Sequence, residues 1–467
     1  MSDYFTLSFR PDIYLTLEGD RLTLQSPSEC LTLEHPKPGL RSALEQLLHS
    51  ALTTTQLTAL VVETDGIEDG LSFEAELQKL ISLGWISHSV LPLATAIPIA
   101  ENYQLISAVF DWQQQPLTLS RFAFLHQENQ QFVLESPISK AKIILLDWRA
   151  TALIAKLAQS SFTLKNLVET LIDEEIAESF VQLLIATQMI PLEPESKALA
   201  QWEFHNLLFH RQTRSERLDD LRKSKVPRFE DHERSPVVKP PMSNQVIALE
   251  KPDLVTLAKT DCSLTQAIEA RQSIREYDRQ PITLNQLGEF LYRCARVKEV
   301  YSQENNPLNM GEFTKRPYPC GGGLYELEIY PVINQCQGLN SGLYHYQPLS
   351  HTLHLIADLH EVEVLIYDAW KATGQQDIPQ VLFIVTARFG RLFWKYYAIG
   401  YGLILKHIGV LYQTFYLVAT AMKLAPSAIG AGNSEQFSKI ANLNEYEEAS
   451  VGEFSLGSLK QTNDNPS

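Results

Sequence analysis

The sequence lacks the features that mark several classes of protein. Its five cysteines are scattered without a CxxC pair, so neither a structural zinc site nor a disulfide framework is indicated. Positive charge is scarce, because 39 Lys and Arg residues stand against 55 Asp and Glu residues, for a net charge of −16. Binding to nucleic-acid phosphates requires clustered Lys and Arg, so nucleic acid is not expected as the main partner.

Targeting and nucleotide-binding signatures are also missing. The N-terminal residues carry neither the basic nor the apolar region of a secretory signal, and unpaired cysteines suit a reducing compartment, so a cytoplasmic location is expected. No GxxxxGKS/T motif occurs, and no GxGxxG lies in a strand–turn–helix setting. Folds that bind ATP or nicotinamide dinucleotides through these loops are therefore not supported.

One long apolar run could be mistaken for a membrane span. Residues 398–422 contain no acidic residue, and their only basic residues are Lys406 and His407. A Lys–His pair near the middle of a span would be unfavourable in lipid. Three glycines in the run would let another helix approach closely. We therefore expect a buried core or dimer helix, and no membrane partner.

An internal repeat is present in the N-terminal part. Residues 22–27 (LTLQSP) and 132–137 (FVLESP) share a pattern, and each is followed by another apolar strand and two helical stretches. A strand pair followed by helices, repeated after about 110 residues, predicts two winged-helix-like modules. Residues 1–200 hold 12 Lys and Arg against 25 Asp and Glu, which argues against DNA. Two alternatives remain: peptide recognition at an exposed strand edge, or a dimer scaffold.

Composition predicts four segments and an α+β fold class. We expect winged-helix-like modules at residues 1–95 and 96–200, a helical segment with a charged linker at 201–260, and a sheet flanked by helices at 261–467. In the last segment, helices are expected at 264–270 and 284–295, the second capped by Thr283. Strands are expected at residues 324–333, 342–346, 352–356, 381–387 and 454–457.

Three short motifs carry the chemistry. Arg271-Gln-Ser-Ile-Arg275 places two guanidinium groups and a hydroxyl on one turn, which suits a phosphate, although a surface salt-bridge cluster would explain the motif taken alone. Pro319-Cys-Gly-Gly-Gly323 lacks three Cβ atoms, so main-chain N–H groups can approach a ligand, unless the run is only a flexible loop. Ala428-Ile-Gly-Ala-Gly432 either places backbone amides against a ligand or simply ends a helix.

Together with Gly342-Leu-Tyr-His-Tyr346, these motifs resemble the flavin-dependent nitroreductase superfamily, and within it the SagB-type azoline dehydrogenases. The N-terminal double module is similar to that of the cyanobactin oxidases. The resemblance implies FMN bound in a homodimer. It also implies oxidation of thiazolines or oxazolines to azoles in a heterocyclised precursor peptide of ribosomal origin, with the cyclodehydratase of the pathway as a further partner. Cys320 departs from the pattern, because family members often carry Ser there; Cys is small enough to fit, but the departure puts the hydroxyl's hydrogen bond in question.

The resemblance also assigns roles to single residues. Lys395 and Tyr396 match a catalytic Lys–Tyr pair, in which Lys395 would accept the carbon-bound proton and Tyr396 would orient it or relay the proton. Tyr397 competes with Tyr396 for this role. No metal ligands are expected. Cofactor binding is assigned to Arg271, Ser273, Arg275, Pro319, Cys320, Gly321, Gly323, Gln413, Ala428, Ile429, Gly430 and Lys460.

Two other functions compete with azoline oxidation. The first is a general nitro or quinone reductase that uses NAD(P)H, but such an enzyme would not need 200 extra N-terminal residues. The second is a peptide-binding adaptor with a degenerate flavin fold, but the arginine turn and the glycine loop are both intact.

Overall fold

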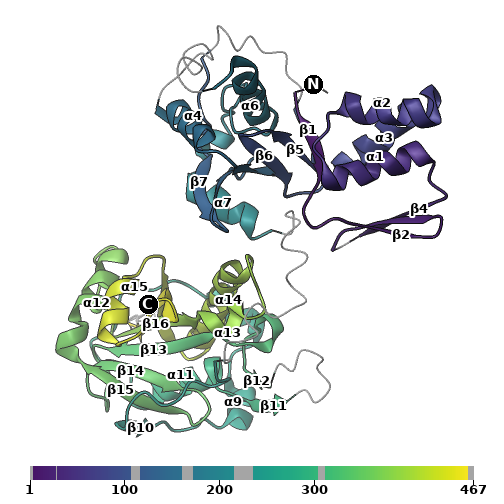
Figure 1. Cartoon of the computed structure of the whole chain (residues 1–467). Helices are drawn as coiled ribbons and strands as arrows, with labels where there is room; N and C mark the ends of the chain where they lie inside the picture. Colours follow the sequence, from purple (N-terminus) through teal and green to yellow (C-terminus); the bar gives the residue numbers. More distant parts are fainter. Residues whose placement is uncertain are drawn as a thin grey trace. The chain divides into compact units, whose positions relative to one another are not determined.

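The computed structural model describes residues 4–27, 29–106, 116–159, 172–214, 235–302 and 311–460. The chain divides into two compact units, with unit 1 spanning residues 1–223 and unit 2 residues 224–467 (Figure 1). Each unit has its own hydrophobic core, and each is described by itself.

Unit 1 contains the repeat, because each copy has three antiparallel strands followed by helices. In the first copy an apolar/polar alternation gives the middle strand one buried face, whereas in the second copy two consecutive residues of that strand, Val133 and Leu134, are buried. Leu22 and Leu24 are buried in the first copy, as is Leu134 in the second. The first copy consists of β2 (Tyr14–Glu18), β3 (Arg21–Gln25), β4 (Cys30–Glu34), α1 (Pro38–His49), α2 (Thr54–Asp65) and α3 (Ile67–Ser82). The second consists of β7 (Phe124–Glu128), β8 (Gln131–Glu135), β9 (Ala141–Leu145), α4 (Trp148–Gln159) and α6 (Glu174–Ala186).

The two copies are joined through one six-stranded sheet with the order β1-β5-β6-β9-β8-β7. Strands β1 (Thr6–Phe9), β5 (Ile86–Val90) and β6 (Ala94–Pro98) come from the first half, and β9 pairs with β6 antiparallel. Strands β2–β4 form a separate three-stranded sheet. The module boundary expected at residue 95 therefore falls inside β6, and one hydrophobic core runs through both copies.

The helical segment after the second copy is tied to it by Arg121. This side chain forms a salt bridge with Glu195 at 3.0 Å and donates to the carbonyl oxygens of Leu199 and Trp202. The segment comprises η1 (Leu199–Gln201) and α7 (Phe204–Gln212). Phe204 of α7 packs edge-on against Phe124, with ring centroids 5.6 Å apart. Residues 215–234 of the predicted linker lie outside the described residues.

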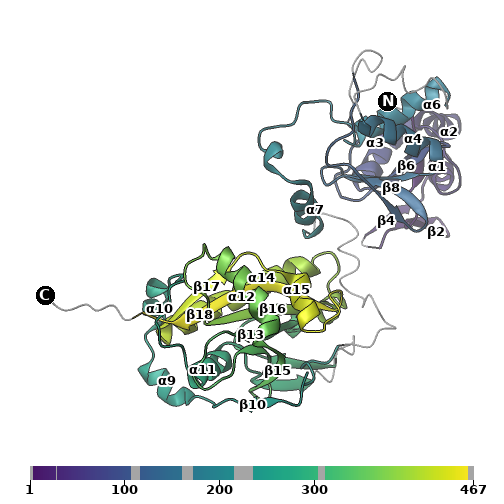
Figure 2. The same cartoon turned by 90° about the vertical axis from the view of Figure 1, so that its left-hand side faces the viewer.

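Unit 2 is built on a seven-stranded antiparallel sheet with the order β10-β15-β14-β13-β16-β18-β17 (Figure 2). Its strands are β10 (Val246–Ala248), β13 (Leu327–Ile333), β14 (Gly342–Gln347), β15 (Thr352–Asp358), β16 (Val381–Arg388), β17 (Leu424–Ile429) and β18 (Glu448–Ser458). A separate hairpin joins β11 (Glu299–Ser302) to β12 (Glu312–Lys315). The helices are α9 (Leu254–Thr260), α10 (Leu264–Ala270), α11 (Leu284–Ala295), α12 (Leu359–Ala372), α13 (Phe389–Phe393), α14 (Gly400–Ala421) and α15 (Ser434–Ile440).

Both faces of this sheet are covered by helices. Successive side chains of a strand point to opposite faces, so Phe383 of β16 packs with α11 and α14, whereas its neighbour Ile384 packs with α12 and α15. Every residue of β13 and β16 is buried, which explains their mostly apolar sequences, and the buried charges of Glu328 and Arg388 pair with each other. The α+β fold class predicted for the chain is confirmed.

Helix α14 is the apolar run noted in the sequence. Its buried face includes Ile404, Leu411 and Phe415, and the Phe415 ring lies 5.1 Å from that of Phe454 on β18. Among the described residues it is the one helix long and apolar enough to cross a membrane, a test that the core helix of a soluble domain also passes. Its outer face is partly exposed, with Tyr401 41% and Leu405 43% exposed.

Part of the predicted linker, residues 235–239, is held by side chains of unit 2. Arg388 and Arg391 donate to the carbonyl oxygens of Pro236 and Ser235, and Lys239 pairs with Glu448 at 2.5 Å. Buried guanidinium groups require acceptors, and this stretch of main chain supplies them.

Candidate functional site

The glycine loop and the Lys–Tyr pair meet in unit 2. Gly322 has a φ of +63°, a conformation that side chains with a Cβ rarely adopt. A Cβ atom placed on Gly322 would lie 3.1 Å from Lys395 Nζ and 3.1 Å from the Tyr396 hydroxyl. The third of the three nearest atoms belongs to Leu324, so Tyr396 lies beside Lys395 at the loop. Gly322 therefore lies where the two polar groups converge.

A short helix places the Lys–Tyr pair. The amide groups of Lys395 and Tyr396 both donate to the carbonyl of Leu392, at 3.1 and 2.9 Å, so α13 ends in a tight turn just before them. The buried guanidinium of Arg391 donates from Nε to the carbonyl oxygen of Leu324, at 2.7 Å. The segment that carries the pair is thereby tied to the residue that follows the glycine loop.

A buried polar cluster supports the loop from behind. The Gly321 amide donates to His407 Nε2 at 2.8 Å, and His407 Nδ1 lies 2.6 Å from a carboxylate oxygen of Glu326, which is fully buried. The Cys320 thiol lies 3.2 Å from the other Glu326 oxygen and accepts a hydrogen bond from the Tyr325 amide. Burial raises the pKa of the Cys320 thiol, so it stays protonated and can donate to Glu326.

Sequence reasoning missed Glu326 and His407 as site residues. It considered His407 only as a charge that would be unfavourable in a membrane, and Glu326 only as part of a strand. The partners are 81 residues apart in the chain, so only the packing of α14 against the start of β13 brings them together.

Helix α14 also carries a second cluster, around Tyr416. Its hydroxyl lies 2.7 Å from Ser273 Oγ and accepts a hydrogen bond from the Ala428 amide at 2.8 Å. The Arg271 guanidinium lies 5.2 Å from the centre of the Tyr416 ring. The Ile274 amide donates to a carbonyl oxygen of β17, which fixes the arginine turn beside this strand. Tyr416 thus joins two of the predicted motifs, although the sequence did not single it out.

The two clusters are spaced along one helix. His407 and Tyr416 are nine residues apart on α14, which corresponds to about 14 Å along the helix axis. The glycine loop contacts the first position and the arginine turn the second.

The other residues predicted to bind the cofactor differ from one another in their exposure and contacts. Lys460 is close to the arginine turn, but its ammonium pairs with Glu276 at 3.1 Å and Asp377 at 3.2 Å. The Ile429 side chain is 5% exposed and belongs to the core under α12 and α15, so only its main chain can face a ligand. Arg275 is half-buried. Three further residues are exposed, namely Pro319, Gln413 and Gly430.

Two groups of metal-ligating residue types occur among the described residues. One is the Cys320–Glu326–His407 cluster, in which hydrogen bonds already engage all three side chains. The other is in unit 1, where Lys142 pairs with Glu128 of the group His126, Glu128 and Glu135. The absence of a metal site stays a prediction.

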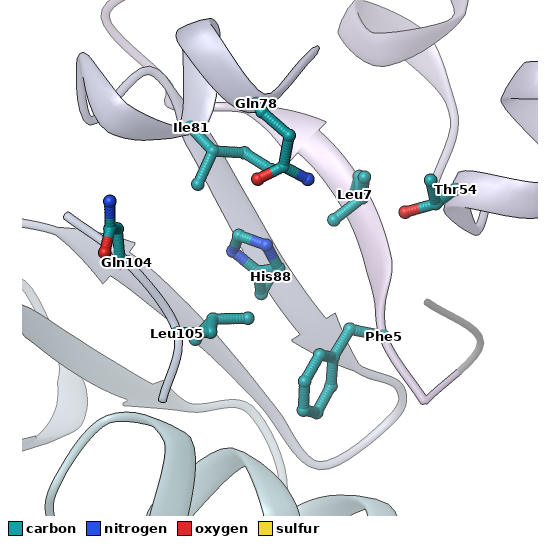
Figure 3. Close-up of a pocket in the computed structure, with 8 residues that line it drawn as sticks. All are labelled: Phe5, Leu7, Thr54, Gln78, Ile81, His88, Gln104 and Leu105. Atoms are coloured by element: carbon teal, nitrogen blue, oxygen red, sulfur yellow. The ribbon is translucent and has the colours of Figure 1, made fainter. Parts of the chain in front are cut away.

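Unit 1 has a pocket of its own, with a volume of about 400 Å³. Figure 3 shows its lining: residues of β1, β5 and α3 face a common space, with Thr54, Gln104 and Leu105 around it. His88 on β5 is buried, and burial lowers its pKa to about 3, so its imidazole is neutral at physiological pH. The lining combines apolar side chains with the uncharged polar groups of Thr54, Gln78, Gln104 and His88, so it suits an uncharged group better than an anion.

Comparison with protein families gives three matches. Residues 268–458 match the nitroreductase family, residues 117–219 match the cyanobactin oxidase ThcOx, and residues 1–107 match the helix-turn-helix domain of ThcOx.

Individual relatives agree with these matches. MJ1384 of Methanocaldococcus jannaschii, named for the nitroreductases, is 27% identical over 186 residues, which cover 40% of this chain and 87% of that protein. The microcin B17-processing protein McbC of Escherichia coli is 27% identical over 136 residues, or 28% of this chain and half of McbC. A similar solved structure is the E. coli microcin synthetase McbBCD complex with truncated pro-MccB17 bound, with 18% identity, 51% of this chain and 88% of that chain covered, and a TM-score of 0.34.

Residues 268–458 of unit 2 therefore form a nitroreductase-family domain, which supports oxidoreductase activity. The two N-terminal matches specify the branch, because the chain has the domain composition of a cyanobactin oxidase. The resemblance predicted from the motifs is confirmed.

Proposed function

We propose that the protein is an FMN-dependent azoline oxidase, which dehydrogenates thiazoline or oxazoline rings to thiazoles or oxazoles in a ribosomally made peptide. The observation that carries this proposal is the convergence of Lys395 Nζ and the Tyr396 hydroxyl on Gly322, inside a nitroreductase-family domain. The ThcOx matches and the relative McbC, named for microcin processing, support a peptide substrate.

The residues present fit FMN at both ends of the proposed site. At one end, Arg271, Ser273 and Arg275 offer two guanidinium groups and a hydroxyl to a phosphate. At the other end, Gly322 and Gly323 have positive φ angles and no Cβ atoms, so a flat ring can approach the main chain. When bound, FMN would supply the hydride acceptor.

Lys395 is the proposed proton acceptor. Oxidation of an azoline to an azole removes a hydride and a carbon-bound proton, and Lys395 Nζ would take the proton at the glycine loop. Nζ lies 5.3 Å from the centre of the Tyr396 ring. Burial raises the pKa of Tyr396, so its hydroxyl stays protonated and can orient Lys395 by donating a hydrogen bond.

The proposal includes three partners. The partly exposed apolar face of α14, with Tyr401 and Leu405, suits a second copy of the chain and hence a homodimer. The substrate would be the heterocyclised precursor peptide. Unit 1, with its uncharged pocket beside the edge strand β1, would recognise that peptide or the cyclodehydratase that prepares it.

Flavin content and substrate choice test this function. The purified protein should be yellow and should release FMN on denaturation. It should oxidise an azoline peptide, and it should consume NADPH with nitroaromatic compounds only slowly. Rapid NADPH consumption with no azoline oxidation would make it a general reductase. A colourless protein that binds peptide but not added FMN would make it an adaptor.

A further inference from the structure

Behind the glycine loop, a histidine holds a backbone amide in place. Gly321 N–H can only donate, so His407 Nε2, 2.8 Å away, must accept and must carry no proton. The ring proton of neutral His407 is then on Nδ1, which faces the Glu326 carboxylate at 2.6 Å. Glu326 therefore fixes the tautomer that allows His407 to accept from the loop.

This hydrogen bond determines which way the loop faces. Gly321 is directly followed by Gly322, whose φ of +63° turns the main chain toward Lys395 and Tyr396. Glycines have no side chain to hold them, so a run of three is mobile unless its amides are bound. A Cβ on Gly321 would lie 3.2 Å from His407 Nε2, so the imidazole also packs closely against the loop.

We propose that Glu326 and His407 are positioning residues, which hold the Gly321 amide so that Gly322 presents its main chain to the Lys395–Tyr396 pair. Neither side chain takes part in the chemistry. Their importance for catalysis rests on the proposed function of that pair, but the loop contact itself does not.

Two substitutions of His407 separate positioning from packing. In His407→Gln the side-chain carbonyl can reach the place of Nε2 and accept from Gly321, although the ring is lost. In His407→Phe the ring is kept, but the Gly321 amide loses its acceptor. If His407 only fills space, His407→Phe should keep the glycine loop closer to its native state than His407→Gln does. If it holds the amide, Gln should replace it better than Phe.

Hydrogen–deuterium exchange of the full chain, followed by mass spectrometry of the peptide around residues 319–325, measures the contact without cofactor or substrate. His407→Phe should exchange roughly tenfold faster in this peptide, since an amide that has lost its acceptor is no longer protected. His407→Gln should stay close to the parent protein, and peptides of β16 should be unchanged in both variants.

The inference is overturned if exchange in the loop peptide is unaltered by Phe, or if Gln accelerates it as much as Phe does. Should the Phe variant fail to fold, the Gln variant still decides, because unprotected loop amides there would contradict the proposal. Azoline oxidation measured on the same samples keeps the two proposals apart. A parent protein that protects the loop but oxidises no azoline would reject the proposed function and leave the loop contact standing.

Discussion

At the scale of single residues, the site depends on a position with no side chain. Gly322 combines a positive φ with the close approach of Lys395 Nζ and the Tyr396 hydroxyl, both 3.1 Å from where a Cβ would be. The glycine run was recognisable in the sequence, and the resemblance singled out Lys395 and Tyr396, but the close approach of this pair to Gly322, more than 70 residues away in the chain, could not be predicted.

Gly322→Ala should abolish azoline oxidation, because the added methyl group pushes Lys395 and Tyr396 apart. Gly374→Ala is the matched control, since Gly374 has a φ of +81° and nothing within 4 Å of a Cβ. Both variants should lose ~1–2 kcal/mol of unfolding free energy through backbone strain, measured by denaturant titration. Equal oxidation rates in the two variants would show that Gly322 is needed only for its backbone conformation.

Tyr416→Phe tests the second cluster. The variant removes the hydroxyl that bonds Ser273 and the Ala428 amide, so the arginine turn should loosen and FMN should bind about fivefold more weakly, the equivalent of one hydrogen bond. Fluorescence titration of the apoprotein with FMN measures this change. Tyr446→Phe, at a residue 84% exposed, should bind FMN as the parent does. Unchanged affinity in Tyr416→Phe would exclude Tyr416 from the cofactor site.

At the scale of elements, the sequence predicts a helix correctly where the residues at its ends mark its boundaries. Helix α11 begins after Thr283 as expected, because Thr283 and Gln286 form a capping box, and α10 spans the expected residues 264–270. Strand β13 begins at Leu327 rather than at residue 324, since Leu324 is helical and Tyr325 has a φ of +47° as the loop turns into the strand. Tyr416, Glu326 and His407 could not be found, because their roles depend on packing between distant elements.

Helix α14 links the two clusters, and its outer face carries the proposed dimer contact. Leu405→Lys should place a charge in that contact and yield a monomer with weakened FMN binding, measured by light scattering and flavin content. Val364→Lys on α12, where Val364 is 37% exposed, is the control and should remain dimeric. A Leu405→Lys variant with the parent's mass in solution would exclude this face as the dimer contact.

At the scale of the whole molecule, the chain joins an oxidoreductase domain to an N-terminal unit whose two repeat copies share one sheet. The repeat was visible in the sequence, but the joining of its copies was not. Strand β6 pairs with β9 of the other copy, and no local sequence pattern predicts which strand edges pair. The repeat was visible because the spacing of apolar residues within each copy is a local pattern.

His88 makes the stability of unit 1 depend on pH. Its pKa is about 3 in the folded protein and near the ordinary 6.5 when unfolded. Between these values only the unfolded state binds the proton, so stability is complete above pH 6.5 and falls as the pH decreases toward 3. At pH 5 the loss should be about 2 kcal/mol. Hydrogen exchange of unit 1 peptides at pH 6.5 and pH 5, corrected for intrinsic rates, measures it. His88→Leu should remove this part of the pH dependence, and a variant with the parent's dependence would contradict the assignment.

The central claim is that the Lys395–Tyr396 pair at the glycine loop performs azoline oxidation. Mass spectrometry of an azoline-containing peptide incubated with the FMN-loaded protein tests it most directly, with Lys395→Ala in parallel. The peptide should lose two hydrogens per ring with the parent protein and stay unchanged with a Lys395→Ala protein that still holds FMN. An unchanged peptide with the parent protein, or full oxidation by Lys395→Ala, would contradict the claim.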